Sequence, residues 1–346
     1  MARVIIVRHD IEVPALYGAA AALVAARENG RLFWPDARFD LARHPDAVQH
    51  VADEGALIPS GLIWSDRIVG LPARPLAELA GEGLAVVPGP PAFLSDPGAV
   101  ERLRAEGAEV RTVTLDGDRF VDEAGAVSGW RDRFGRVLPE RPSLAVASGP
   151  VIGLVGSETQ LRDTCPAPLA ALADAIEAEA PGGDIRFVDP HRVSDGALDG
   201  LDGLLLPGGS DVTLAAGQVS LAGSARAAGL PLLGLCLGMQ SMATAIARQV
   251  PGWTTAEMAE AAPDAERHSV VPIETGEHRL GRLEIRAVPG SRLAALLSAE
   301  TAIAYNHRHR LAPALHEALA SAGVRVAAFG GRQTRASPTP SRLKTA

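Results

Sequence analysis

The chain has 346 residues, of which 47% are hydrophobic, and a formal net charge of −8. This length can bury two hydrophobic cores, and the negative charge argues against nonspecific binding to nucleic acid or to an anionic membrane surface. The two cysteines, Cys165 and Cys236, are too few for a disulfide framework, so a cytoplasmic location is expected. No apolar run approaches the length of a membrane span, and the N-terminus reads as a short strand rather than a signal peptide.

Residues 1–148 alternate between strand-like and helix-like segments, which favours a small α/β domain. Turn residues at 116–118 and at Gly125 predict that a β-hairpin closes this domain. Prolines and small residues at 139–150 are typical of a linker. The expected strands are 3–7, 84–87 and 109–115, and the expected helices are 14–28 and 99–106.

Two short motifs in this domain have competing interpretations. Val7-Arg8-His9 resembles the Arg-His-Gly start of histidine phosphatases, but Asp10 stands where the glycine would be, so a plain histidine at a strand end is the better account. Pro88-Gly89-Pro90-Pro91 would follow a strand at its carboxyl end, where ligand sites of α/β proteins often lie. A rigid turn without a ligand is the favoured interpretation of these prolines.

Two strand-to-turn segments mark the second half of the chain. Residues 201–211 predict a buried strand that runs into Pro207-Gly208-Gly209, a turn whose bare N–H groups could stabilise negative charge. Residues 229–235 predict another strand, followed by Cys236 and a helix at 241–250. A thiolate is stabilised at a helix N-terminus, and Gly234 and Gly238 let the chain turn tightly, so Cys236 is a candidate nucleophile. The alternative is a buried structural cysteine.

Taken together in chain order, these pieces resemble the glutaminase domain of class I, or triad, glutamine amidotransferases, and most closely that of CTP synthase. The matching segments are 151–156, Leu206-Pro207-Gly208-Gly209, Gly234-Leu235-Cys236-Leu237-Gly238-Met239-Gln240, Thr255-Ala256-Glu257-Met258, 279–281 and His307-Arg308-His309-Arg310. The resemblance implies a flavodoxin-like open sheet with helices on both faces at 149–330, preceded by the smaller α/β domain at 1–148. It covers about half the chain.

The resemblance also implies roles for individual residues. Cys236 would attack the side-chain amide of L-glutamine, release ammonia and leave a glutamyl thioester for water to hydrolyse. The N–H groups of Gly209 and Leu237 would hold the oxyanion, and the segment Leu237-Gly238-Met239-Gln240 would line the glutamine pocket. Glu257 would bind the substrate ammonium and Arg310 its carboxylate, for which a planar guanidinium is suited. For Glu257 and Arg310 the alternatives are a solvated glutamate and a basic surface turn. No metal and no cofactor are expected.

The base that such a cysteine needs is the point where the chain departs from the family. The family supplies it from a His-Pro-Glu motif beyond the His-Arg-His-Arg segment, and this sequence has no such motif. His307 and His309 are possible substitutes, whereas His316 and Glu317 are adjacent on an expected helix at 314–322 and cannot face the same way. Residues 323–329 predict a strand, and 331–346, which are basic and lack apolar periodicity, predict a disordered tail.

The expected function is therefore a glutaminase that supplies ammonia to a separate synthetase in nucleotide-related or specialised metabolism. The alternative is a degenerate amidotransferase fold that binds glutamine or a protein partner without turnover. Whole-chain CTP synthase activity is not expected, because no Gly-x-x-x-x-Gly-Lys-Ser/Thr run occurs and Lys344 is the sole lysine of the sequence.

Overall fold

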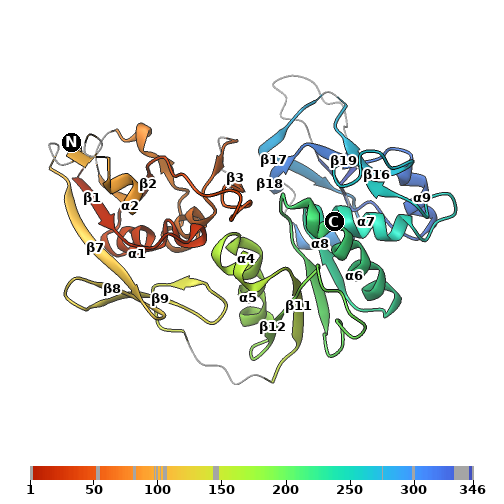
Figure 1. Ribbon diagram of the computed structural model, residues 1–346, viewed down its shortest axis with the longest axis horizontal. Helices are drawn as coiled ribbons and strands as arrows, with labels where there is room; N and C mark the ends of the chain where they lie inside the picture. The colour runs from red at the N-terminus through yellow and green to blue at the C-terminus, as the bar shows by residue number, and fades with distance from the viewer. Residues whose placement is uncertain are drawn as a thin grey trace. The chain divides into compact units, whose positions relative to one another are not determined.

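Figure 1 shows the computed structural model, in which the chain divides into two compact units. The N-terminal unit comprises Met1–His50, Leu57–Gly149 and Glu158–Gly182, and the C-terminal unit comprises Val51–Ala56, Pro150–Ser157 and Gly183–Ala346. The structure describes residues 3–344 apart from 52–54, 81–82, 97, 99, 102, 104–106, 143–147, 275, 298–300 and 331–342. The predicted linker and the predicted helix at 99–106 lie partly outside these described residues.

A mixed sheet forms the centre of the N-terminal unit, in the order β10-β9-β8-β7-β1-β6-β2-β5. Strand β1 is parallel to both of its neighbours, β6 and β7, and β6 is parallel to β2. The antiparallel hairpin β8–β9 follows β7 and confirms the predicted closing hairpin (Figure 1). The strands are β1 (Arg3–Arg8), β2 (Arg31–Trp34), β5 (Arg74–Pro75), β6 (Leu84–Gly89), β7 (Glu109–Asp116), β8 (Arg119–Asp122), β9 (Val127–Arg131) and β10 (Val137–Leu138).

Both faces of this sheet are covered, as expected for an α/β layer structure. Val4 and Ile6 of β1 pack with Phe93 of α2 in one core cluster, and the alternate residue Ile5 is equally buried. Helix α1 contacts β1, β2 and β6. The other elements are η1 (Pro14–Leu16), α1 (Ala19–Glu28), β3 (His50–Val51), β4 (Leu57–Ile58), η2 (Ser60–Leu62), η3 (Ser65–Val69), η4 (Leu76–Glu78), α2 (Pro91–Leu94), α4 (Glu158–Asp163) and α5 (Pro166–Glu179).

Helices α4 and α5 belong to the N-terminal unit, although they follow the domain boundary predicted at 148/149. The side chain of Arg136, which is only 6% exposed, contributes to this grouping. Its Nη1 donates to Asp174 Oδ1 and to Glu177 Oε2 of α5, each at 2.7 Å, and its Nε donates to Asp132 Oδ2, also at 2.7 Å. Ion pairs that involve a buried group are little screened, so this network joins α5 to the β9–β10 region.

His9, directly after β1, gives the N-terminal unit a pH-dependent stability. Burial is the main cause that lowers its pKa from 6.5 to about 4. The unfolded chain therefore takes up the proton first, so stability is fully present above pH 6.5 and falls toward pH 4, by up to about 1.4 kcal/mol per pH unit. In His9→Leu we expect the free energy of opening of the β1 amides, obtained from hydrogen exchange rates corrected for the pH dependence of intrinsic exchange, to depend less on pH in this window than in wild type. His191→Leu, at an exposed position, should behave like wild type, and an unchanged pH slope in His9→Leu would refute the assignment.

A fully parallel sheet forms the centre of the C-terminal unit, in the order β12-β11-β13-β14. Its strands are β11 (Val151–Val155), β12 (Asp184–Val188), β13 (Gly203–Leu206) and β14 (Leu232–Gly234). With β11 as the first strand, the order is 2-1-3-4, which is that of flavodoxin-like sheets. The predicted α/β fold with an open parallel sheet is confirmed.

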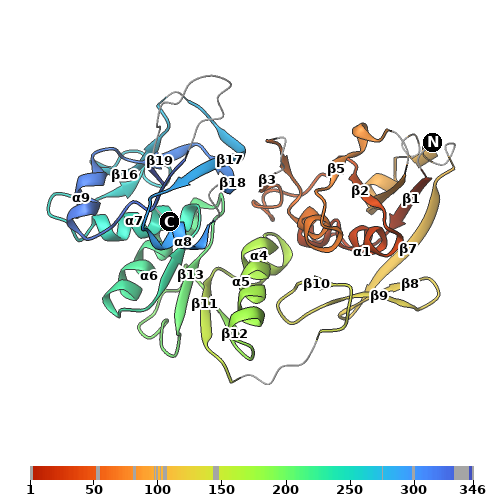
Figure 2. The same cartoon turned by 180° about the vertical axis from the view of Figure 1, so that it is seen from behind.

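The rest of the C-terminal unit consists of two further sheets and several helices, which Figure 2 shows from behind. The sheets have the orders β15-β16-β19 and β18-β17-β20-β21. The elements are η5 (Val212–Leu214), α6 (Ala215–Ala227), α7 (Leu237–Ala247), β15 (Glu257–Met258), β16 (His268–Pro272), β17 (Arg279–Ala287), α8 (Arg292–Leu296), β18 (Thr301–His307), β19 (His309–Leu311), α9 (Leu315–Ser321), β20 (Ala328–Gly330) and β21 (Leu343–Lys344). Of the predicted tail, only β21 lies among the described residues, and it pairs with β20.

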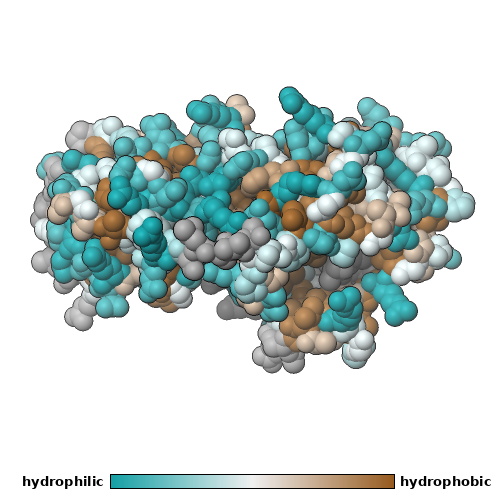
Figure 3. All heavy atoms as spheres, turned by 90° about the horizontal axis from the view of Figure 1, so that it is seen from below, coloured by the Kyte–Doolittle hydropathy of each residue, from teal (hydrophilic) through white to brown (hydrophobic). Residues whose placement is uncertain are grey.

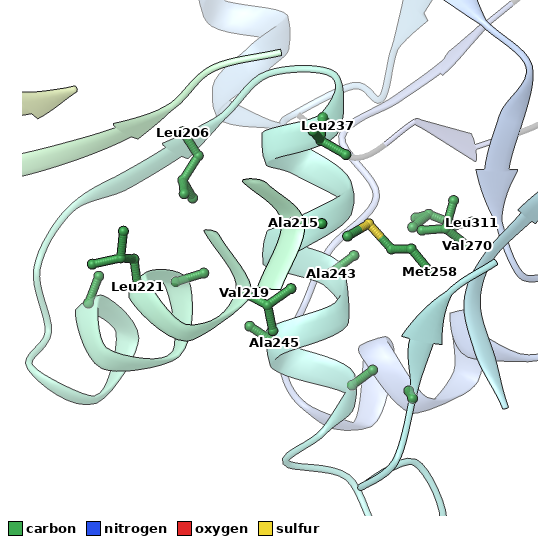
Figure 4. Close-up of a cluster of buried hydrophobic side chains, with 14 of the residues drawn as sticks. Leu206, Ala215, Val219, Leu221, Leu237, Ala243, Ala245, Met258, Val270 and Leu311 are labelled. Atoms are coloured by element: carbon green, nitrogen blue, oxygen red, sulfur yellow. The ribbon is translucent and has the colours of Figure 1, made fainter. Parts of the chain in front are cut away.

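One hydrophobic core cluster holds the central helices of this unit against two sheets (Figure 4). Leu206 of β13 and Leu237 of α7 belong to it, together with Met258, Val270 and Leu311 from β15, β16 and β19. These three are at most 4% exposed, and β16 pairs directly with both neighbouring strands. The cluster therefore fixes α7, and with it the turn at Cys236, relative to the parallel sheet.

The surface mixes hydrophilic and hydrophobic side chains (Figure 3). Most of the large exposed hydrophobic residues belong to the C-terminal unit, including Leu233 and Leu235, which flank Gly234 and are 50% and 40% exposed. Within the described residues, no helix is both long and apolar enough to span a bilayer.

Candidate active site

Cys236 lies at the sharp turn between β14 and α7. Its backbone has φ 51° and ψ −112°, and Asn29 is the other described residue besides glycine with a positive φ. A side chain in this region of backbone space costs of order 1–3 kcal/mol and occurs mainly at functional sites. Helix α7 begins at Leu237, four residues before the predicted start, so Cys236 is its N-cap residue and lies at the positive end of the helix dipole.

The glycines on either side of Cys236 are required by close backbone contacts. A Cβ on Gly234 would lie 2.6 Å from the carbonyl oxygen of Gly238, and a Cβ on Gly238 would lie 2.1 Å from the carbonyl oxygen of Leu206. Contacts this short do not occur in folded proteins, so any larger residue forces the backbone to move. The tight turn predicted from these two glycines is confirmed.

The glycine-rich turn after β13 lies against the cysteine. A Cβ on Gly208 would be 2.7 Å from Cys236 Cβ and 3.5 Å from its Sγ. No hydrogen bond among the described residues uses the N–H of Gly209 or of Leu237. The glycine turn thus lies beside Cys236, and Leu237 follows it directly in the chain. The role of the Gly209 and Leu237 N–H groups as oxyanion donors stays a prediction.

A buried polar network, which the sequence analysis did not identify, joins the two turns. Gln218 of α6 donates from Nε2 to the carbonyl oxygen of Pro207 at 3.3 Å, and its Oε1 accepts a 2.9 Å bond from Ser241 Oγ. Ser241 Oγ also lies 3.0 Å from the carbonyl oxygen of Leu237. Gln218 and Ser241 are fully buried, so their bonds fix the glycine turn relative to the start of α7. Ser241 is the first residue of the helix predicted at 241–250, but no helix was predicted around Gln218, so the sequence held no signal for this pair.

The predicted pocket residues on α7 are largely inward-facing. Leu237 and Gln240 are buried at 4% and 6% exposure, and Met239 packs partly buried against the core. Thr244 Oγ1 donates to the carbonyl oxygen of Gln240 at 2.8 Å and lies 2.6 Å from Ser269 Oγ, which donates to the carbonyl oxygen of Glu257 at 3.0 Å. This chain of bonds connects the helix of the cysteine to the strand of Glu257.

The Glu257 carboxylate itself forms an ion pair with Arg248, the residue that follows α7. Cys236 begins the helix and Arg248 ends it, so these two residues are about 18 Å apart along the helix axis at 1.5 Å per residue. The structure thus engages Glu257 at the carboxyl end of α7 rather than beside the thiol. Its role in binding the substrate ammonium stays a prediction.

Arg310, on β19, pairs with Glu274, whose side chain is 70% exposed, whereas that of Arg310 is only 11% exposed. The positive charge of Arg310 also acts on His316, whose pKa is lowered chiefly by burial and further by this charge. A guanidinium that is mostly buried but whose partner is exposed can exchange that partner for another carboxylate. The predicted role of Arg310 as carboxylate ligand is untested, and it requires Glu274 to be displaced.

The histidines considered as substitute bases lie on consecutive strands of two different sheets, His307 on β18 and His309 on β19. His309 Nδ1 is 3.2 Å from Glu260 Oε2, which makes a histidine–carboxylate pair of the kind that orients a general base. His307 ends β18, and its ring meets the edge of Tyr305 at 6.1 Å between centroids. His316 is on α9 next to Glu317, as predicted. Among the described residues, no group of three or more His, Cys, Asp or Glu side chains is arranged to hold a metal ion.

Comparison with known proteins finds related sequences for the part of the chain that holds this site. Residues 185–334 match the family model for class-I glutamine amidotransferases. CTP synthase of Saccharopolyspora erythraea is 31% identical over 252 residues, and this match covers 68% of this chain and 42% of that protein. CTP synthase of Chloroflexus aggregans is 31% identical over 213 residues, and this match covers 56% of this chain and 38% of that protein. The chain thus spans less than half the length of the curated relatives it matches.

Among solved structures, the glutaminase domain of Trypanosoma brucei CTPS with bound acivicin is similar to this chain, with 26% sequence identity and a TM-score of 0.48. The match covers 52% of this chain and 75% of the trypanosomal one. A glutamine amidotransferase of Thermotoga maritima is similar at 13% identity and a TM-score of 0.34, over 47% of this chain and 62% of that one.

Proposed function

We propose, from the premise that residues 185–334 form a class I glutamine amidotransferase domain resembling that of CTP synthase, that this chain binds glutamine and hydrolyses it through a thioester on Cys236. The ammonia would serve a separate synthetase. The observation that carries the proposal is the strained Cys236 at the N-terminus of α7, with the Gly208–Gly209 turn against its side chain.

The proposed reaction uses groups that the turn holds in place. Attack of the thiolate on the glutamine amide forms a C–S bond and a negative oxygen, which the N–H groups of Gly209 and Leu237 would stabilise. Collapse of that intermediate breaks the C–N bond, and protonation of the leaving nitrogen gives ammonia. Water then cleaves the thioester to glutamate. The histidine–carboxylate pair His309–Glu260 is the proposed source of the proton and of the base.

The direct test measures glutamate release and glutamine binding side by side. Wild type should bind glutamine in a calorimetric titration and release glutamate, Cys236→Ala should bind without release, and His309→Gln should release glutamate at least about a hundredfold more slowly. His268→Gln, which changes a histidine on the neighbouring strand, is the control. Equal background release from wild type and Cys236→Ala, with glutamine still bound, would favour a fold that binds without turnover. Absence of glutamine binding would refute both functions.

The ion pair of Arg310 predicts opposite effects of two substitutions on glutamine affinity. Arg310→Ala should weaken glutamine binding by at least about tenfold, because a charge-assisted hydrogen bond to the substrate carboxylate is lost. Glu274→Gln should strengthen binding several-fold, because the competing carboxylate of the protein loses its charge. Glu284→Gln, at an exposed position of β17, is the matched control for calorimetry. Weaker binding in Glu274→Gln would remove Arg310 from the proposed pocket.

A further inference from the structure

A cavity of about 250 Å³ lies in the N-terminal unit, and none of the residues that line it was assigned to the candidate active site. Three segments line it, each of which follows a strand of the parallel part of the sheet. They are 11–13 after β1, 36–44 after β2 and 90–93 after β6. Since β1, β6 and β2 are parallel neighbours, the cavity lies at the carboxyl ends of three adjacent strands.

The connections that leave β1 and β6 run in opposite directions across the sheet. In the sheet, the order of the strands is β7-β1-β6-β2. From β1 the chain passes through α1 to β2, which lies beyond β6. From β6 it passes through α2 to β7, which lies beyond β1 in the opposite direction. This arrangement is a topological switch point, and the crevice at such a point is where open α/β sheets bind ligands. The loop Pro90-Pro91, for which the sequence favoured a plain turn, forms one wall of it.

Charged groups of both signs face this cavity without ion-pair partners. Arg38 and Arg43 supply two guanidinium groups, and Glu12 and Asp36 supply two carboxylates. None of the four has an ion pair or side-chain hydrogen bond among the described residues. Asp40, by contrast, is occupied, because its Oδ1 accepts bonds from the backbone N–H groups of Ala42 and Arg43 at 3.0 and 3.3 Å.

An aromatic wall completes the cavity. The rings of Tyr17 and Phe39 meet edge to face, with centroids 5.7 Å apart at 84°, and Phe93 lies on the α2 side. The hydroxyl of Tyr17 donates to the carbonyl oxygen of Pro35 at 2.8 Å, which holds that ring in place. A second cavity of about 770 Å³ shares Asp36, Arg38 and Phe93 and is lined mainly by apolar residues such as Trp34 and Leu79. It leaves room for a larger apolar group beyond the first.

We propose that this cavity binds a zwitterionic α-amino acid with an apolar or aromatic side chain. Its carboxylate would pair with Arg38 or Arg43, its ammonium with Glu12 or Asp36, and its side chain would pack on Tyr17, Phe39 and Phe93. Opposite charges in one small cavity suit a ligand that carries both signs. A nucleotide fits less well, because the loop from Arg8 to Gly18 has no glycine before Gly18 to bring backbone N–H groups to a phosphate, and the two carboxylates would repel that phosphate.

Calorimetry with the full chain carrying Cys236→Ala tests this proposal, since that variant cannot turn over an amino-acid ligand at the other site. The amino-acid probes are L-phenylalanine and L-leucine. Two blocked analogues are compared with them: L-phenylalaninamide lacks the carboxylate, and N-acetyl-L-phenylalanine lacks the ammonium. AMP is the nucleotide probe. We expect saturable binding of phenylalanine or leucine and at least about tenfold weaker binding of both blocked analogues. Arg38→Ala and Asp36→Asn should each weaken binding of the amino acid by a similar factor.

Arg119→Ala, on the exposed hairpin β8–β9, removes the same charge from the same unit and should bind the amino acid like the parent. Asp36→Asn keeps the shape of the side chain, so a folding defect in Arg38→Ala would not obscure the result. Blocked analogues that bind as tightly as phenylalanine, an equal effect of Arg119→Ala, or binding of AMP alone would each overturn the proposal. No binding of either amino acid to the folded protein would overturn it as well.

Discussion

Replacing Cys236 with glycine should abolish glutamine hydrolysis and yet make the C-terminal unit more stable than in wild type. The sulfur is the proposed nucleophile, so its loss should lower glutamate release by at least about a thousandfold. The backbone of Cys236, at φ 51° and ψ −112°, holds a side chain in a region that glycine occupies without strain. Relief of this strain stabilises the folded unit, whereas the greater conformational entropy of glycine stabilises the unfolded chain. The net effect should be a gain of about 1 kcal/mol in the stability of the unit.

Cys236→Ala is the matched control, because it removes the sulfur but keeps a Cβ at the same strained position. It should lose turnover like the glycine variant and remain near the stability of wild type. Denaturant unfolding followed by a probe in the C-terminal unit measures the difference between the two variants. A glycine variant less stable than the alanine variant would show that the turn at Cys236 carries no strain.

Replacing Gly238 with alanine should destabilise the C-terminal unit by roughly 2–4 kcal/mol, in the range of overpacking substitutions. The new Cβ would lie 2.1 Å from the carbonyl oxygen of Leu206 and 2.7 Å from its Cβ, and neither can move without shifting β13 or α7. Because that shift would also separate the glycine turn from Cys236, glutamine hydrolysis should fall with stability.

Gly223→Ala is the control for this substitution, since Gly223 lies inside α6 and a Cβ added there would have no atom within 4 Å. Alanine there should stabilise the helix by about 0.5–1 kcal/mol. Thermal unfolding of both variants in parallel gives the comparison. If Gly238→Ala were as stable as Gly223→Ala, the close approach of α7 to β13 would be wrong.

The turn at Cys236 was predictable because its determinants are local. A run of apolar residues, a cysteine between two glycines and a helix-forming segment specify a strand, a tight turn and a helix within about 20 residues. The position of the helix start was less predictable. The sequence placed it at 241, whereas the close approach permitted by Gly238 lets α7 begin at Leu237.

Partners of the charged site residues could not be predicted, because they depend on which strands become neighbours. Glu257 pairs with Arg248 and Arg310 with Glu274, and both pairs exist only once α7, β15, β16 and β19 have assembled on a common core. Gln218 and Ser241 are similar in this respect, since two separate helices must pack before their side chains meet.

The sequence by itself determined the tight turn at Cys236, several of the strands and the resemblance to class I amidotransferases, because periodicity and glycine spacing act over a few residues. Only the tertiary structure decided that α4 and α5 belong to the N-terminal unit, where Arg136 bonds to α5, and that three segments meet in a cavity near Arg38. Sheet order and helix crossing bring together segments that are tens of residues apart. Their contacts depend on how whole elements pack, and no local pattern encodes that.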